Sequence, residues 1–311
     1  MNYIFGIDIG GTTVKCGLFL ENGELTDKWE ISTDRSNNGG NILPDVAKSV
    51  LDKAAEKQIS KEQILGIGMG VPGPVLADGT VLRCANLGWD IVNAKDIMEQ
   101  LTGVRVCVGN DANVAALGEA KKGGGRGFDS VLMVTLGTGV GGGLIINGKI
   151  VCGSNGAAAE IGHIIVNGEE TDTCGCGGHG HLEQYASATG IVRMAKKRLA
   201  IENIASSLRS FETLTAKDIF DEAKKGDLLA TQLVDKLGSY LALALSHVAA
   251  TADPEAFVIG GGVSRAGQIL LDAIEKHYNN NIMKALQGKK FLLAELSNDA
   301  GIYGAAGMVT E

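Results

Sequence analysis

The stretch DIGGTTVK at residues 8–15 decides the fold of this chain, because it recurs in altered form as LGTGVGGG at residues 136–143. Each copy lies between two apolar runs, and an Asn-Gly pair follows the second run. Such a pair is typical of a two-residue β-hairpin turn, in which both central residues have positive φ. The two pairs are Asn22-Gly23 and Asn147-Gly148. The sequence therefore predicts two related halves, each with a hairpin that presents a glycine turn.

Glycine turns of this kind predict a phosphate site. They let a ligand approach the main chain, and their successive amides form an anion-binding nest. In the first copy, Thr12 and Thr13 add hydroxyl donors and Lys15 adds a cation. Asp8 supplies a carboxylate beside the turn, where a phosphate-bound magnesium ion can be held. This combination is what a nucleoside triphosphate site requires.

Two other phosphate-binding patterns fit the glycines poorly. Gly137, Gly139 and Gly142 match GxGxxG, and Glu160 follows at about 20 residues, where a dinucleotide fold has its ribose-binding acid. That fold requires a helix directly after the glycines, whereas residues 144–146 continue as a strand into Asn-Gly. A Walker loop fails because no Gly-Lys-Ser/Thr follows at the required spacing.

The composition restricts the class of protein. The chain has 311 residues, enough for two domains, and its 28 basic and 36 acidic residues give a net charge of -8. With no long basic run and few aromatic residues, the sequence argues against a nucleic-acid partner. No apolar stretch reaches the ~18 residues that cross a bilayer, and no leader pattern precedes the first strand, so we expect no membrane partner and a cytoplasmic location.

Apolar periodicity predicts alternating strands and helices, which indicate an α/β protein of two domains. The glycine-rich segment 123–129 is the best candidate for the boundary between them. The expected strands are 2–8, 14–20, 25–31, 64–70, 104–108, 130–136 and 256–264, and the expected helices are 42–58, one ending near 122, 183–199, 215–224, 228–251 and 300–309.

Asn110-Asp111 follows a strand and precedes a helix, the usual place for functional residues in α/β sheets. Either Asp111 or Asn113 can cap that helix, and capping is the common task of an aspartate there. A carboxylate that faces a cleft between two phosphate turns is also placed to take a proton from an attacking hydroxyl, as phosphoryl transfer requires. The two roles are compatible.

The segment 157–184 gathers acids, histidines and two cysteines. A CxC pair followed by histidine is a zinc signal, and His163, Cys174, Cys176 and His181 complete four nitrogen and sulfur ligands. The alternative is a polar glycine loop with free thiols. Four protein ligands leave no open position, so this zinc would be structural and would hold the loop that carries Glu160 and Glu183.

Seven motifs, in order across nearly the whole chain, resemble the ROK family of bacterial sugar kinases and repressors, and most closely its ATP-dependent glucokinases. They are DIGGTTVK, GVPGPV, GNDANVAALGE, LGTGVGGG, EIGH, CGCGGHGHLEQ and VIGGG. The resemblance implies an actin-like (ribonuclease H-like) α/β fold of two domains, with a sugar in the interdomain cleft, ATP on the glycine hairpins and a homodimer. We expect an N-terminal domain over 1–122, completed by a C-terminal helix at about 300–311, and a C-terminal domain over 123–299 with the zinc loop.

The resemblance also implies roles for individual residues. Asp111 is expected to be the general base for the sugar 6-hydroxyl. The expected sugar-binding residues are Gly73, Asn86, Asn110, Asp111, Glu160, His163 and Glu183. The expected ATP contacts are Gly10, Gly11, Thr12, Lys15, Thr138, Gly139, Gly261 and Gly262, with Asp8 near magnesium.

Two positions depart from the family pattern. The zinc loop of the family usually has a third cysteine where this chain has His181, and His179 is a nearby competitor for the fourth ligand position. Ala159 stands where glycine commonly precedes the EIGH glutamate, and its added methyl group is expected to shift the loop.

The expected activity is transfer of the γ-phosphoryl group of ATP to the 6-hydroxyl of D-glucose. A kinase for fructose, mannose or an N-acetylhexosamine is the alternative within enzymes, and polyphosphate is an alternative donor. A sugar-sensing repressor is the alternative from another class, but the first strand begins at residue 2 or 3 and leaves no room for a preceding DNA-binding segment.

Overall fold

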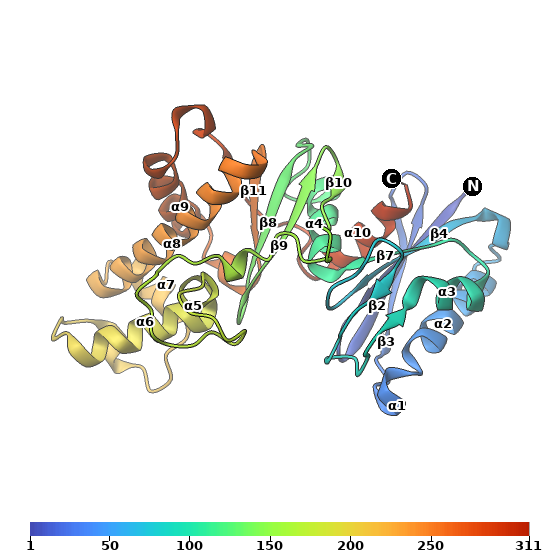
Figure 1. The fold of residues 1–311 in the computed structure, drawn as a ribbon, viewed down its shortest axis with the longest axis horizontal. Helices are drawn as coiled ribbons and strands as arrows, with labels where there is room; N and C mark the ends of the chain where they lie inside the picture. The colour runs from blue at the N-terminus through green and yellow to red at the C-terminus, as the bar shows by residue number, and fades with distance from the viewer. Residues whose placement is uncertain (311) are drawn as a thin grey trace. The chain divides into compact units, whose positions relative to one another are not determined.

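The computed structural model describes residues 1–310 and divides into two compact units. Unit 1 comprises Met1–Asp129, Gly143–Ala158 and the chain from Glu295 onward. Unit 2 comprises Ser130–Gly142 and Ala159–Ala294. The chain therefore passes between the units four times, and each unit is a five-stranded sheet with helices (Figure 1).

The sheet of unit 1 has the order β3-β2-β1-β4-β7. Strands β1, β2 and β3 are antiparallel, whereas β4 and β7 run parallel to β1. The strands are β1 (Tyr3–Ile9), β2 (Thr13–Leu20), β3 (Leu25–Ser32), β4 (Ile64–Val71) and β7 (Val106–Asn110). A short pair, β5 (Thr80–Val81) and β6 (Val92–Asn93), lies outside this sheet.

Helices cover both faces of the unit 1 sheet. On one face, alternate residues of β1 such as Phe5 and Ile7 pack with α2 (Ile42–Glu56) and α3 (Ala94–Thr102). On the other face, Ile4 packs against α10 (Ala300–Val309). Helix α4 (Asp111–Lys122) packs beside α10, so the C-terminal helix completes the N-terminal unit. A one-turn helix, α1 (Ser36–Gly39), precedes α2.

Unit 2 repeats this plan with the sheet order β10-β9-β8-β11-β12. Its strands are β8 (Val131–Leu136), β9 (Val140–Ile146), β10 (Lys149–Ile150), β11 (Ala256–Gly260) and β12 (Lys290–Leu293). β10 is antiparallel to β9, whereas β11 is parallel to both β8 and β12. Residues 143–158, which end β9 and form β10, nevertheless group with unit 1 by their contacts.

The helices of unit 2 surround a long core helix. They are α5 (Glu183–Ala186), α6 (Ala188–Ile201), α7 (Ala216–Lys224), α8 (Leu228–Ala252) and α9 (Gln268–Asn281). Contrary to the expectation from the sequence, α8 is long and apolar enough to cross a membrane by length and composition alone. More than half of its most apolar window is buried, and it packs against α9 and α7. Its apolar character is explained by this packing.

Three local expectations need correction. The helix expected over 183–199 is broken at Ser187, whose hydroxyl caps α6 by accepting a hydrogen bond from Gly190 N. Strand β12 was not expected. The second hairpin turn has positive φ at Asn147 and Gly148 as predicted, but in the first turn only Gly23 has positive φ.

Candidate functional site

The first glycine turn joins β1 to β2. Gly10 N donates to Thr13 O at 3.0 Å, and a β-carbon on Gly10 would come within 2.8 Å of the same oxygen. Gly11 lies against the main chain of Asn86, whose carbonyl oxygen would be 3.7 Å from a β-carbon there. The turn and the expected sugar-binding loop are therefore neighbours within unit 1, and glycine is required where the turn closes.

Asp8 lies next to this turn in a partly buried position. Burial raises its pKa, Lys15 lowers it and Asp111 raises it, and the net result is a pKa of about 6. Lys15 also donates from Nζ to the Asn298 carbonyl oxygen at 3.0 Å. A carboxylate whose charge is poorly solvated has a strong tendency to take up a cation, which suits a group expected near magnesium.

Asn110, and neither Asp111 nor Asn113, caps α4. Its Oδ1 accepts hydrogen bonds from Ala112 N and Asn113 N, at 3.1 and 3.2 Å. Asn110 fits this position because its extended backbone directs its side chain back at the first amides of the helix. The expectation that Asp111 or Asn113 is the cap was therefore wrong.

Asp111 is instead the first residue of α4, at the carboxyl end of β7. Its Oδ1 accepts hydrogen bonds from Ala112 N at 2.8 Å and from Asn110 Nδ2 at 3.1 Å. Asn110 Nδ2 also donates to the carbonyl oxygen of Gly73, which follows β4 with a φ of 95°. The asparagine thus orients the carboxylate and ties it to the neighbouring loop.

Unit 1 therefore brings together its share of the predicted residues at the carboxyl ends of β1, β4 and β7. That share is Asp8, Gly10, Gly11, Thr12, Lys15, Gly73, Asn86, Asn110 and Asp111.

The second glycine turn lies in unit 2, between β8 and β9. Glu183 Oε2 accepts a hydrogen bond from Val140 N at 3.2 Å, and a β-carbon on Gly139 would collide with the same oxygen. Thr138 presents its carbonyl oxygen to the Thr189 hydroxyl at 2.7 Å. Gly139 and Glu183 are thus in contact, and Thr138 lines the same pocket as both.

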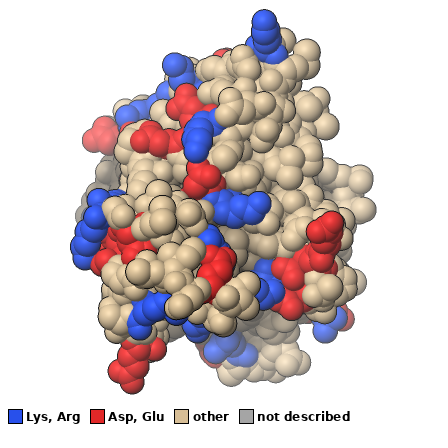
Figure 2. Space-filling view, turned by 90° about the vertical axis from the view of Figure 1, so that its left-hand side faces the viewer, with Lys and Arg blue, Asp and Glu red and all other residues tan. Residues whose placement is uncertain are grey.

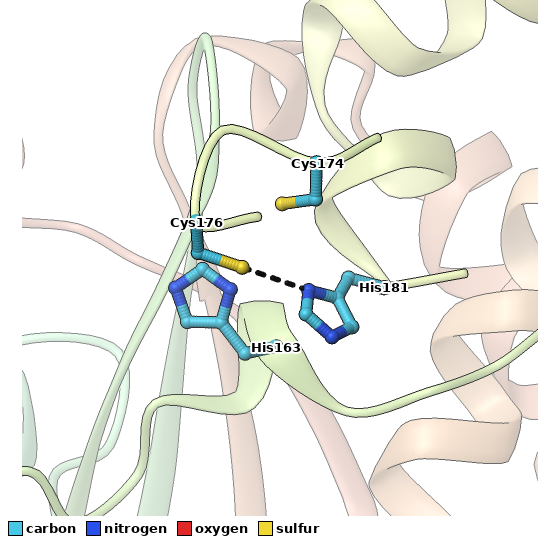
Figure 3. A group of neighbouring side chains, drawn as sticks. All are labelled: His163, Cys174, Cys176 and His181. Atoms are coloured by element: carbon cyan, nitrogen blue, oxygen red, sulfur yellow. Dashed lines mark hydrogen bonds between the residues drawn. The ribbon is translucent and has the colours of Figure 1, made fainter. Parts of the chain in front are cut away.

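The predicted zinc ligands form one cluster (Figure 3). One ligand atom from each of four residues lies within 4.8 Å of the others, and the residues are His163, Cys174, Cys176 and His181. Cys176 Sγ and His181 Nδ1 are 3.2 Å apart. His179 lies outside this group, with its Nδ1 at 3.3 Å from the Asp172 carbonyl oxygen. The donor set of two thiols and two imidazoles fits tetrahedral zinc.

An ion-pair network braces the loop that carries the cysteines. Glu170 accepts hydrogen bonds from the Tyr185 hydroxyl at 2.6 Å and from Arg193 at 2.8 Å. Burial alone raises the pKa of Glu170, but hydrogen bonds from Tyr185, the Asp172 main chain and Arg193 outweigh it and lower that pKa to about 2. Lys197 adds an ion pair to Asp172 at 2.6 Å. Basic and acidic side chains are likewise interspersed on the face drawn in Figure 2.

Glu160 precedes a turn of 3-10 helix, Ile161–His163, that also carries the first zinc ligand. The residue before it, Ala159, has a φ of 62°, a left-handed conformation that disfavours any side chain. Ala159 O accepts a hydrogen bond from Ile161 N at 2.7 Å and lies against Gly142. The departure from glycine at this position therefore places strain next to an expected sugar-binding carboxylate.

Gly261 and Gly262 follow β11, where Gly261 has a φ of 83°. Gly262 borders a pocket of about 390 Å³ that Val263, Phe220 and Lys224 also line. The sequence did not predict that α7 lines this pocket, because no local pattern reveals which helix will pack beside a distant glycine turn.

Residues 4–311 match the family model described as the ROK family. The chain belongs to the ROK family. Among its relatives, the glucokinase of Halalkalibacterium halodurans is 41% identical, with 98% of this chain and 94% of that one covered. The glucokinase of Thermotoga maritima is 35% identical, over 99% of this chain and 97% of that one.

A solved ROK structure is also similar along its whole length. The ROK family glucokinase from Streptomyces griseus, in complex with glucose and AMPPNP, is 35% identical, covers 99% of both chains and superposes with a TM-score of 0.71. The two-domain actin-like fold expected of the ROK family from the sequence is thereby confirmed.

Proposed function

We propose that the protein is a glucokinase, which transfers the γ-phosphoryl group of ATP to the 6-hydroxyl of D-glucose. The observation that carries this proposal is Asp111, a carboxylate oriented by Ala112 N and Asn110 at a strand end, in a chain similar to curated glucokinases along nearly its whole length. Asp111 accepts the proton of the attacking hydroxyl, and general-base help of this kind contributes roughly 10² to 10⁴ in rate.

The glycine turns bind ATP in this proposal. Gly11 and Thr12 in one turn, and Thr138 and Gly139 in the other, offer main-chain amides and hydroxyls to phosphate oxygens, while Gly10 closes the first turn and lets the phosphates approach it. The pocket beside Gly262 is large enough for the purine base. Magnesium, held near Asp8, neutralises charge on the phosphates when it is bound.

The sugar hydroxyls are bound by side chains from two groups of residues. Asn110 presents its amide beside Gly73, with Asn86 on the neighbouring loop, and Glu160, His163 and Glu183 belong to the segment that the zinc cluster organises. A histidine with one ring nitrogen on a metal keeps its other nitrogen as a donor, so His163 can serve zinc and sugar together.

Zinc is structural in this proposal, because four protein ligands saturate its coordination. The thiols and imidazoles of Cys174, Cys176, His163 and His181 hold it, and their effect is to order the loop before Glu183. The homodimer stays a prediction of the resemblance, and the cytoplasmic location stays a prediction from the sequence.

A coupled assay of ADP release over a panel of hexoses tests the proposed function. We expect the highest kcat/KM with glucose and ATP. A higher kcat/KM with fructose, mannose or an N-acetylhexosamine would assign the protein to another hexose kinase, and faster turnover with polyphosphate than with ATP would change the donor.

A further inference from the structure

Glu119, in the last turn of α4, is fully buried at 0% exposure. Its carboxylate accepts three main-chain hydrogen bonds. Oε2 accepts from Gly124 N at 2.9 Å and from Glu295 N at 3.0 Å, and Oε1 accepts from Leu296 N at 2.8 Å. A buried carboxylate is costly unless it is fully hydrogen-bonded, and here two of the three donors lie 176 and 177 residues away in the sequence.

The bonded segments are the ends of two connections between the units. The chain leaves unit 1 for the first time after Asp129, a few residues beyond Gly124. It returns for the last time at Glu295, whose amide is itself one of the donors. Glu119 therefore joins the outgoing and the returning chain on the unit 1 side, and all four bonded residues belong to that unit.

The same helix carries Asp111 as its first residue. Eight residues of α-helix separate Asp111 from Glu119, a distance of about 12 Å. Helix α4 has little freedom to bend or slide, because its glycine and those of α10 bring the two helices into close contact. A β-carbon on Gly118 would collide with Ala300 O, and one on Gly304 would collide with Val114 O. The two ends of α4 thus move as one body.

We propose that Glu119 is a positioning residue for phosphoryl transfer, which fixes the ends of two inter-unit connections to the helix that presents Asp111. When the units move on substrate binding, the ends of both connections then stay at a constant distance from the base, Asp111. This inference rests on the proposed function only for the need to align a hydroxyl with a phosphate. It assigns Glu119 no contact with substrate.

Glu119→Gln tests the inference, because it keeps the shape and removes one acceptor. If the new NH2 group takes the place of Oε1, the hydrogen bond from Leu296 N is lost. If it takes the place of Oε2, the hydrogen bonds from Gly124 N and Glu295 N are both lost. Hydrogen exchange at these three amides measures, without any substrate, how firmly Glu119 holds the two connections. We expect exchange to rise at least ~10-fold there. Exchange unchanged at Glu295 and Leu296 would overturn the inference.

Kinetics and X-ray scattering separate positioning from stability. At a temperature where the variant is folded, we expect kcat to fall about tenfold. We also expect the glucose-induced change in radius of gyration to become smaller. Glu99→Gln is the matched control, because Glu99 Oε1 accepts from Val106 N at 2.9 Å inside unit 1 and away from the connections. A variant that melts earlier but keeps kcat and the scattering change would overturn the proposal.

Glu119→Asp covers the case in which the amide variant does not fold. It keeps the charge but shortens the side chain by one methylene, so it cannot reach all three donors in the same position. The same exchange and kinetic outcomes apply. Wild-type protein that is inactive on glucose would refute the proposed function, whereas the exchange measurement would still decide whether Glu119 holds the two connections.

Discussion

Gly301 lies so close to Asp8 that a β-carbon on the glycine would come within 2.5 Å of Asp8 Cγ. The glycine is in the first turn of α10, a helix from the far end of the sequence. Helix N-termini favour negative charge, and the missing side chain lets the carboxylate approach that end of the helix. The C-terminal helix therefore helps to shape the site that the first strand begins.

Gly301→Ala is expected to displace Asp8 and to destabilise the protein by about 1–3 kcal/mol, the usual cost of overpacking. Thermal unfolding and kcat measure the two effects. Gly307→Ala in the same helix is the control, because its β-carbon would meet only side-chain ends, Lys121 Cδ at 3.3 Å and Leu117 Cδ2 at 3.4 Å, and no main-chain atom. Equal effects of the two substitutions would argue against a specific contact between Gly301 and Asp8.

Asp8 predicts the acid limit of activity. Burial, opposed by Lys15 and reinforced by Asp111, raises its pKa to about 6, so the carboxylate that we propose to hold magnesium is lost as pH falls below that value. The same shift penalises the folded protein as pH rises from the ordinary pKa of 3.8 to about 6. We expect kcat/KM to fall below about pH 6, with the apparent pKa lowered further by bound magnesium.

Asp8→Asn should therefore be inactive yet more stable than wild type by about 3 kcal/mol at pH 8, with the difference nearly gone at pH 4. Denaturant unfolding at the two pH values measures it. A variant less stable than wild type at pH 8 would show that Asp8 gains more from Lys15 than it loses through burial.

Asp111→Asn is expected to reduce kcat by roughly 10² to 10⁴, the range of general-base help. Glucose should still bind, because the amide keeps the size of the carboxylate and one acceptor oxygen, and its NH2 group can donate to a sugar hydroxyl. Calorimetric titration with glucose and a single-turnover assay with ATP measure the two properties. Substantial residual turnover would remove Asp111 from the role of base.

Chelation should release about one zinc ion per chain and loosen the loop before Glu183. His181→Ala should lose the metal, whereas His179→Ala should keep it, because only His181 lies in the ligand cluster. Metal analysis of the purified variants distinguishes them. Native protein without zinc, or zinc retained by His181→Ala, would contradict the assignment.

Much of the fold was predictable because it is written in local periodicity. The apolar alternation of β1 and the helical spacing of α2 come from residues that are neighbours in the sequence. β12 was missed because it is a short, half-buried edge strand that pairs, within residues 1–310, with β11 alone, about 30 residues earlier in the sequence. The cap of α4 was misassigned because Asn110, Asp111 and Asn113 lie within four residues and each can cap, and only the backbone conformation at Asn110 selects one.

The sequence by itself determined the duplicated glycine hairpins, the carboxylate at residue 111 and the cysteine-histidine loop, since each is a short motif with its chemistry in adjacent residues. The tertiary structure alone decided that His181 and not His179 joins the cluster, that Asp8 lies against Gly301, and that Glu119 binds Leu296. These relationships depend on packing between segments far apart in the chain. Local propensity carries no information about which distant backbone amide or helix will fill the space beside a given side chain.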